Sequence, residues 1–339
     1  MSDSVQAVPR LVQARPTLRR GSAIWPTRRE LVLHSFLFLI TIITTIVAGI
    51  VIAEPRLDVP MALPSTLLDY LLFVPQYYSR TVATLLSFAF LHPHVIRDGV
   101  IFSATLLAIL TAHELGHYLA CQRYGVSATL PFFIPAPPLF LAGTFGAFIK
   151  IRSSIPTRRA LFDIGLAGPL AGFIVTVPIG IAGVLSLQPA PPVVGETITF
   201  NDPLLFRLVA SLSGVQLSNT LTNPYYMSAW LGLLVTSLNL MPVGQLDGAH
   251  GTFAVFGQRM HKLIGRVAFV VMAVLAVLGY MWHGSPSGFL YAVLLAVMVK
   301  VRHPAPQQME PVGRARIMIA ILTLIVFVLS FHPFPLTIS

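Results

Sequence analysis

The chain has 339 residues, of which 55% are hydrophobic and 10% are charged, and its mean hydropathy is +0.79. This composition excludes an ordinary soluble globular domain and predicts an all-α polytopic membrane protein. The single cysteine, Cys121, excludes an internal disulfide; it is a candidate soft metal ligand, with a buried thiol as the more common alternative.

The N-terminal part combines a basic tail with a first apolar span. Residues 1–29 contain six arginines and one acid, which is typical of a cytoplasmic tail, although an organelle transit peptide has a similar composition. Residues 31–53 are too long for the apolar region of a signal peptide and predict an uncleaved anchor. In the mixed stretch that follows, residues 81–91 are too short to cross and predict an interfacial or re-entrant piece.

The next apolar segment, residues 100–120, contains the motif His113-Glu114-Leu115-Gly116-His117. Ionisable side chains are costly inside a bilayer and need compensation. Residues four apart share one helix face, so the two histidines can bind one cation while Glu114 lies beside it without binding it. The motif therefore predicts a zinc hydrolase. The alternative is that these polar residues only pack between helices.

A non-helical segment follows the histidine helix, which we expect to end near residue 125. Residues 130–138 are apolar but contain four prolines, and residues 143–152 have the β-branched and aromatic content of a short strand. Because such backbone at membrane depth must be sheltered, we predict a small membrane-associated β-hairpin beside the metal. It either binds extended substrate by edge pairing or merely covers the site. The residues concerned are Gly143, Thr144, Phe145 and Gly146.

The remaining apolar segments bring the total to about seven transmembrane helices. They are residues 163–187, 227–246, 267–282, 288–299 and 317–331. Residues 188–225 and 249–266 are predicted to be loops. We divide the chain into a tail (1–29), an anchor with an extracytoplasmic or re-entrant segment (30–98), a core that carries the metal motif (99–260) and C-terminal helices (261–339).

The distribution of lysine and arginine tests this predicted order and direction of the membrane spans. With the N-terminus in the cytoplasm, 18 of the 22 lysines and arginines fall on the inner side. The positive-inside rule is therefore obeyed, and the net charge of +10 follows from topology in a lipid bilayer rather than from nucleic-acid binding. The bacterial cytoplasmic membrane is the expected location, with the site near its cytoplasmic side.

Asp247 is the predicted third ligand. Hydrolytic zinc sites use three protein ligands and leave a fourth position for water. In this threading the helices that carry His117 and Asp247 run in the same direction and end at similar depth. The alternative for Asp247 is a helix-end carboxylate that binds backbone donors. Competing ligands, which lie outside the spans, are His92, His94 and His250.

These residues suggest a mechanism of peptide hydrolysis. Zinc would lower the pKa of water and polarise the carbonyl, and Glu114 would carry a proton from water to the leaving amine. A transmembrane substrate must unwind locally before attack, because helical hydrogen bonds shield its peptide bonds. Asn239 is a candidate substrate-binding residue, with helix packing as the equal alternative.

Three motifs in this order resemble the site-2 protease family of intramembrane zinc metalloproteases. They are His113 to His117, Gly165 to Gly172 and Asn239 to Gly248. Residues 131–138 and 143–147 resemble the branch found in cyanobacteria, plastids and other bacteria. The resemblance covers about residues 99–260, and the loop at 188–225 is too short for the PDZ domain of many relatives.

The resemblance implies a three-helix catalytic core and one zinc ion. The ligands it implies are His113, His117 and Asp247, with Glu114 as the general base. It also implies cleavage of membrane-anchored regulatory proteins. Two alternatives from other classes remain: a pseudoprotease that binds membrane proteins without cutting them, and a metal-dependent transporter, which would need more charges along its spans.

Overall fold

The structure is a computed structural model that describes residues 26–53, 67–190, 198–301 and 303–338. It consists mainly of helices, with three small two-stranded antiparallel sheets. Nearly all of the predicted basic tail lies outside the described residues, as does the stretch between the first two helices.

Four of the described helices are long and apolar enough to cross a membrane. They are α1 (Arg28–Ala53), α3 (Pro93–Arg123), α4 (Arg158–Leu185) and α7 (Asp247–His283). Three other apolar helices are shorter, with 16, 14 and 17 residues. These are α6 (Pro224–Asn239), α8 (Ser287–Lys300) and α9 (Arg314–Ser330). The prediction of an all-α membrane protein is confirmed, while the number of seven crossings stays a prediction.

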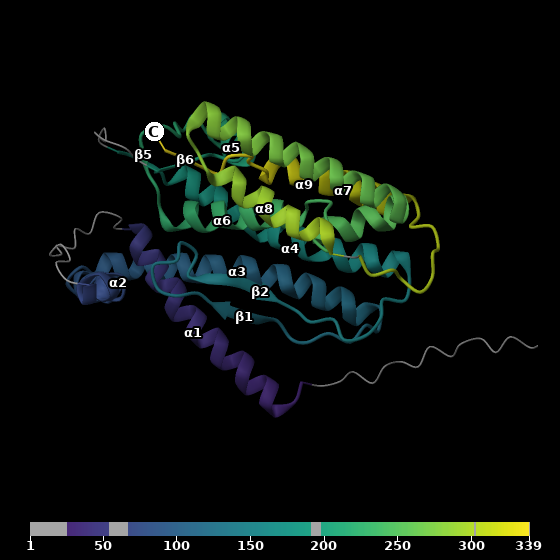
Figure 1. Cartoon of the computed structure of the whole chain (residues 1–339), viewed down its shortest axis with the longest axis horizontal. Helices are drawn as coiled ribbons and strands as arrows, with labels where there is room; N and C mark the ends of the chain where they lie inside the picture. Colours follow the sequence, from purple (N-terminus) through teal and green to yellow (C-terminus); the bar gives the residue numbers. More distant parts are fainter. Residues whose placement is uncertain (1–25, 54–66, 191–197, 302, 339) are drawn as a thin grey trace, which may run out of the picture.

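Helix α3 lies at the centre of the molecule and packs against α1, α4 and α6. The helices α7, α8 and α9 lie on the α4 side of α3, and α1 lies on the other side (Figure 1). The approach of α3 to α4 depends on Gly116, since a methyl group there would lie 2.4 Å from the carbonyl oxygen of Ala167. Small residues thus let the two helices that frame the site come into backbone contact.

The predicted hairpin is present. Strand β1 (Phe132–Pro135) pairs antiparallel with β2 (Thr144–Phe148), with Phe132 opposite Phe148. Strand β1 packs against α1, and β2 contacts α3. Gly143 has a φ of +67°, and a methyl group on it would lie 2.4 Å from the carbonyl oxygen of Thr44. The turn of the hairpin is therefore fixed against α1.

Two segments contain longer helices than the sequence predicts. Helix α2 (Leu67–Leu91) extends well beyond the short piece expected at 81–91, and it is seen almost end-on while the other long helices lie in the plane of the view (Figure 1). The predicted loop at 188–225 contains α5 (Leu204–Ser213), which buries Phe206 and Ala210, one helical turn apart. Two buried positions make too short an apolar pattern to indicate a helix among the surrounding polar residues.

Four short strands form two further antiparallel pairs. Strand β3 (Gln188–Pro189) pairs with β5 (Thr220–Leu221), and β4 (Ile198–Phe200) pairs with β6 (Leu336–Ile338). The pairing between β4 and β6 ties the segment after α9 to the segment before α5.

The prediction that residues 227–246 form one helix is wrong. Helix α6 ends at Asn239, because Pro242 lacks a backbone donor and Gly244 has a φ of +63°. Asp247 is therefore the first residue of α7. That helix also replaces the predicted loop at 249–266 and crosses the expected boundary at 260, with one break at Gly257, where φ is 80° and ψ is 176°.

Candidate metal centre

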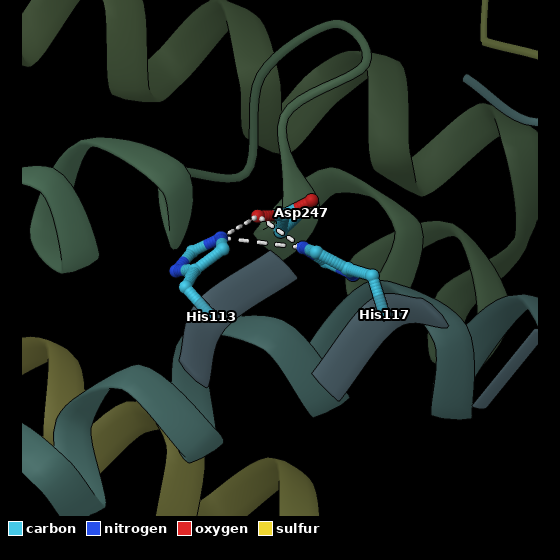
Figure 2. Close-up of side chains that lie close together, drawn as sticks. All are labelled: His113, His117 and Asp247. Atoms are coloured by element: carbon cyan, nitrogen blue, oxygen red, sulfur yellow. Dashed lines mark hydrogen bonds and ion pairs between the residues drawn. The ribbon is translucent and has the colours of Figure 1, made fainter. Parts of the chain in front are cut away.

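Three side chains converge between α3 and the start of α7. His113 and His117 are one turn apart on α3, and the Asp247 carboxylate faces both rings (Figure 2). The Oδ2 atom of Asp247 lies 3.3 Å from Nε2 of His113 and 3.2 Å from Nε2 of His117. The two Nε2 atoms are 3.2 Å apart. The three atoms thus form a nearly equilateral triangle.

This triangle fits a zinc ion. Tetrahedral coordination with bonds of about 2.0 to 2.2 Å separates ligand atoms by about 3.3 to 3.5 Å, close to the observed spacing. The ring of His117 is oriented for this role, because its Nδ1 donates to the carbonyl oxygen of Ile164 at 2.6 Å and leaves Nε2 as the acceptor. Two imidazoles and a carboxylate are also a known zinc ligand set. No other group of this kind occurs among the described residues.

Glycines of α4 make room for the two rings. A methyl group on Gly168 would lie 2.1 Å from Nε2 of His117, and one on Gly172 would lie 3.2 Å from Cβ of His113. The motif from Gly165 to Gly172 therefore houses the imidazoles, which no spacing in the sequence indicates.

Glu114 is buried next to the ligands without joining them. Its side chain is close enough to His117 and Asp247 for their charges to interact, and it lies near the backbone of Ile149. Ile149 follows β2 directly. The end of the hairpin therefore lies beside the carboxylate that was predicted to act as the base.

Asn239, at the end of α6, reaches the site. Its Nδ2 lies 3.3 Å from Nε2 of His113. An amide at this position can donate to a ligand atom or to a group that approaches the metal. The structure therefore places this predicted residue beside the ligands, while its role stays a prediction.

The predicted hairpin residues lie farther from the ligands. Gly143 packs on Thr44 and Thr45, and Thr45 hydrogen-bonds Ser103 at 2.7 Å. Ser103 precedes His113 by ten residues on α3, which corresponds to about 15 Å along the helix axis. The turn of the hairpin is thus at the level of the N-terminal half of α3, and only its return strand leads to the site.

The individual hairpin side chains differ in their availability. Thr144 is buried and uses its hydroxyl within the hairpin, donating to the carbonyl oxygen of Ile134 at 2.8 Å. Phe145 is 54% exposed, and Gly146 has a φ of +109°. Of this set, Phe145 is the large side chain with an exposed surface, although its ring also packs on Phe140, with centroids 4.9 Å apart.

The competing ligands lie elsewhere. His92 precedes α3 and His94 is in its first turn, at the opposite end of the helix from the motif. Cys121 is fully buried and lies outside the ligand group. His250 lies one turn after Asp247 on α7, and its Nδ1 is 2.7 Å from Nε2 of His303. The carbonyl of Ile164 and the backbone of Ile149 were missed because backbone groups leave no sequence signal.

Comparison with known proteins agrees with this geometry. The family model described as Peptidase family M50 matches residues 101–280, more than half of the chain. The protein named "Probable zinc metalloprotease EGY2, chloroplastic" from Oryza sativa subsp. indica is 31% identical over 192 residues, covering 54% of this chain and 34% of that protein. The Arabidopsis thaliana protein of the same name is 28% identical over 261 residues, covering 73% and 44%.

A further relative is "Probable zinc metalloprotease EGY1, chloroplastic" from Arabidopsis thaliana, which is 29% identical over 238 residues. The match covers 67% of this chain and 42% of that protein. The chain thus spans between a third and a half of the length of these curated relatives.

Proposed function

The chain belongs to peptidase family M50, the site-2 protease family, and from this we propose that it is an intramembrane zinc endopeptidase. One observation carries the proposal. The ligand atoms of His113, His117 and Asp247 lie 3.2 to 3.3 Å apart within helices apolar enough to span a bilayer. A buried triangle of this size has no evident purpose in a structural anchor, but it suits a zinc ion.

The chemistry divides between the ion and the protein. When bound by these residues, zinc would supply a Lewis acid that polarises the scissile carbonyl and acidifies water. Glu114 accepts a proton as water oxygen attacks the carbonyl carbon, and it returns that proton to the amine nitrogen as the C–N bond breaks. The nearby backbone of Ile149 would orient the Glu114 carboxylate, and the carbonyl of Ile164 holds the His117 ring.

Asn239 is proposed to position the substrate. Its amide nitrogen lies beside Nε2 of His113, where it can donate to the carbonyl oxygen of a bound peptide. This role predicts a loss of turnover without loss of zinc when the amide is removed. A residue that only packed between helices would change stability instead.

The proposed substrate is a membrane-anchored protein that reaches the site in an extended form. Strand β2 pairs with β1 on one edge, and its other edge has no strand partner among the described residues. A peptide added to this edge would run toward Ile149 and Glu114, because β2 itself leads there. The exposed ring of Phe145 would contact the peptide's side chains.

We further propose that the N-terminus is cytoplasmic and that cleavage occurs near the cytoplasmic surface. The distribution of lysine and arginine supports this orientation. The bacterial cytoplasmic membrane stays a prediction, since the relatives carry the word chloroplastic in their names.

The test is cleavage of a single-span membrane protein in liposomes by zinc-loaded wild type and by Glu114→Gln. Wild type should release fragments, and the variant should retain zinc and release none. Equal cleavage by both would remove the proposed base. Zinc binding without cleavage of any of a panel of substrates would favour a pseudoprotease.

A further inference from the structure

A second polar feature lies beside the turn that precedes Asp247. A cavity of about 400 Å³ opens between the part of α7 after its break, the end of α8 and the turn that precedes Asp247. It is lined by Val243, Gly244, Gln258, His261, Lys262, Gly265, Arg266, Val299, Lys300, Val301 and His303.

All the charged side chains that line this cavity are positive. Lys262, Arg266 and Lys300 contribute three cations, and the lining contains no carboxylate. Within the described part of the chain, none of the three forms an ion pair. Lys262 and Arg266 are four residues apart on one helix face, where like charges repel. An anion would remove that repulsion.

His261 provides an independent sign of a ligand. Its side chain lines the cavity, the residue is only 5% exposed, and its Nδ1 is buried without a hydrogen-bond partner among the described residues. A buried polar nitrogen without a partner is unfavourable, so such atoms commonly face a ligand or an ion.

A histidine pair connects this cavity with the metal centre. His303 donates from Nδ1 to the carbonyl oxygen of Pro304 at 2.7 Å and stacks on Phe253, with ring centroids 4.4 Å apart. Burial, followed by the nearby His250 and His261, lowers the pKa of His303 to about 3. His303 is therefore neutral, and its Nε2 accepts from Nδ1 of His250, one turn after Asp247.

We propose that this cavity is a binding site for a phosphate-bearing anion. Three cations that converge with an imidazole from two helices suit the several oxygens of a phosphate group better than a single carboxylate. Two sources present this chemistry: the head group of an acidic phospholipid, since the cavity opens beside apolar helices, and a free phosphate compound.

The experiment is native mass spectrometry of the full-length, zinc-loaded protein released from detergent. Dioleoyl phosphatidylglycerol is titrated against dioleoyl phosphatidylcholine in one arm, and inorganic pyrophosphate is titrated in the other. The test variant is Lys262→Gln/Arg266→Gln. The matched control is Arg259→Gln, which removes an exposed cation from the same helix outside the cavity. Lys300→Gln tests the other helix.

The double variant should bind the anion at least about tenfold more weakly than wild type, because it loses two charge-assisted contacts to the anion. Lys300→Gln should also weaken binding, and Arg259→Gln should not. Selective binding of phosphatidylglycerol identifies a lipid, and selective binding of pyrophosphate identifies a free phosphate.

Two results overturn the proposal. The first is that wild type binds each probe no more tightly than the double variant and Lys300→Gln bind it. The other is an equal loss of binding in Arg259→Gln, which would show a general effect of surface charge. Zinc content of each variant verifies that it is folded, and Lys300→Gln keeps the test decisive if the double variant does not fold.

Discussion

Two clusters of ionisable side chains join helices around α3 and α4, and they are balanced in different ways. In one, Arg316 of α9 donates to Asp163 of α4 through two nitrogens, at 2.7 and 2.8 Å, and to the hydroxyl of Tyr124 at 3.0 Å. In the other, Asp247 faces His113 and His117. The first cluster contains a permanent cation, whereas the second contains one only if a histidine is protonated or a metal ion binds.

Burial makes this difference consequential. The Arg316 and Asp163 side chains are 23% and 24% exposed, so water screens their charges. The side chains of His113 and His117 are only 5% and 9% exposed. Imidazoles that bind zinc through Nε2 must be neutral, so the ion rather than a protonated histidine would then balance the Asp247 carboxylate. The metal cluster therefore depends on a bound ion in a way that the arginine cluster does not.

The largest effect is expected from removing the anion of each cluster in turn. Asp247→Ala should lose the zinc and all cleavage, because two imidazoles alone leave the site without charge balance. Asp163→Asn should retain the full zinc content. Metal analysis after exhaustive dialysis measures both. Zinc retained by Asp247→Ala would contradict the assignment.

Loss of the base should lower activity without emptying the site. Glu114→Gln keeps the shape of the side chain but cannot accept a proton, so the cleavage rate should fall by about 10² to 10⁴ while zinc stays bound. Glu310→Gln, on the surface, serves as the control. The measurement is single-turnover cleavage in liposomes, and an unchanged rate would rule out the proposed role.

The glycines of α4 allow a graded test of how tightly the site is built. Gly168→Ala places a methyl group 2.1 Å from Nε2 of His117, so zinc affinity should fall by about 10 to 100-fold. Gly172→Ala, whose methyl group would meet His113 at 3.2 Å, should reduce affinity much less. Competition with a zinc chelator measures both. Equal losses would mean that the glycines serve helix packing alone.

The smallest effect is expected in the arginine cluster. Arg316→Gln should lower the stability of the folded protein by about 1 kcal/mol, as is usual for a partly exposed ion pair. Its zinc content and cleavage rate should not change. Thermal unfolding in detergent provides the comparison with wild type, and a loss of zinc in this variant would show that the two clusters are coupled.

The sequence predicts which candidate ligands lie together, because helix geometry converts spacing into position. His113 and His117 share a face by their separation alone, and their place in an apolar segment requires a partner. The hairpin follows from prolines and β-forming residues at membrane depth. Each of these inferences depends on residues near one another in the chain.

Other parts of the site were not predictable, since they depend on contacts between distant segments. The carbonyl of Ile164 and the backbone of Ile149 belong to groups that every residue carries. Asp247 starts α7 rather than ending α6, because the chain turns over 240–246 and forms a new helix. The link between His250 and His303 likewise joins residues far apart in the sequence.

Zinc K-edge X-ray absorption of the purified protein tests the central claim most directly. It should show one zinc ion bound by two imidazole nitrogens and by oxygen at about 2.0 to 2.2 Å, and Asp247→Ala purified in the same way should give no such spectrum because it holds no zinc. A spectrum with a sulfur ligand, or one that Asp247→Ala leaves unchanged, would contradict it.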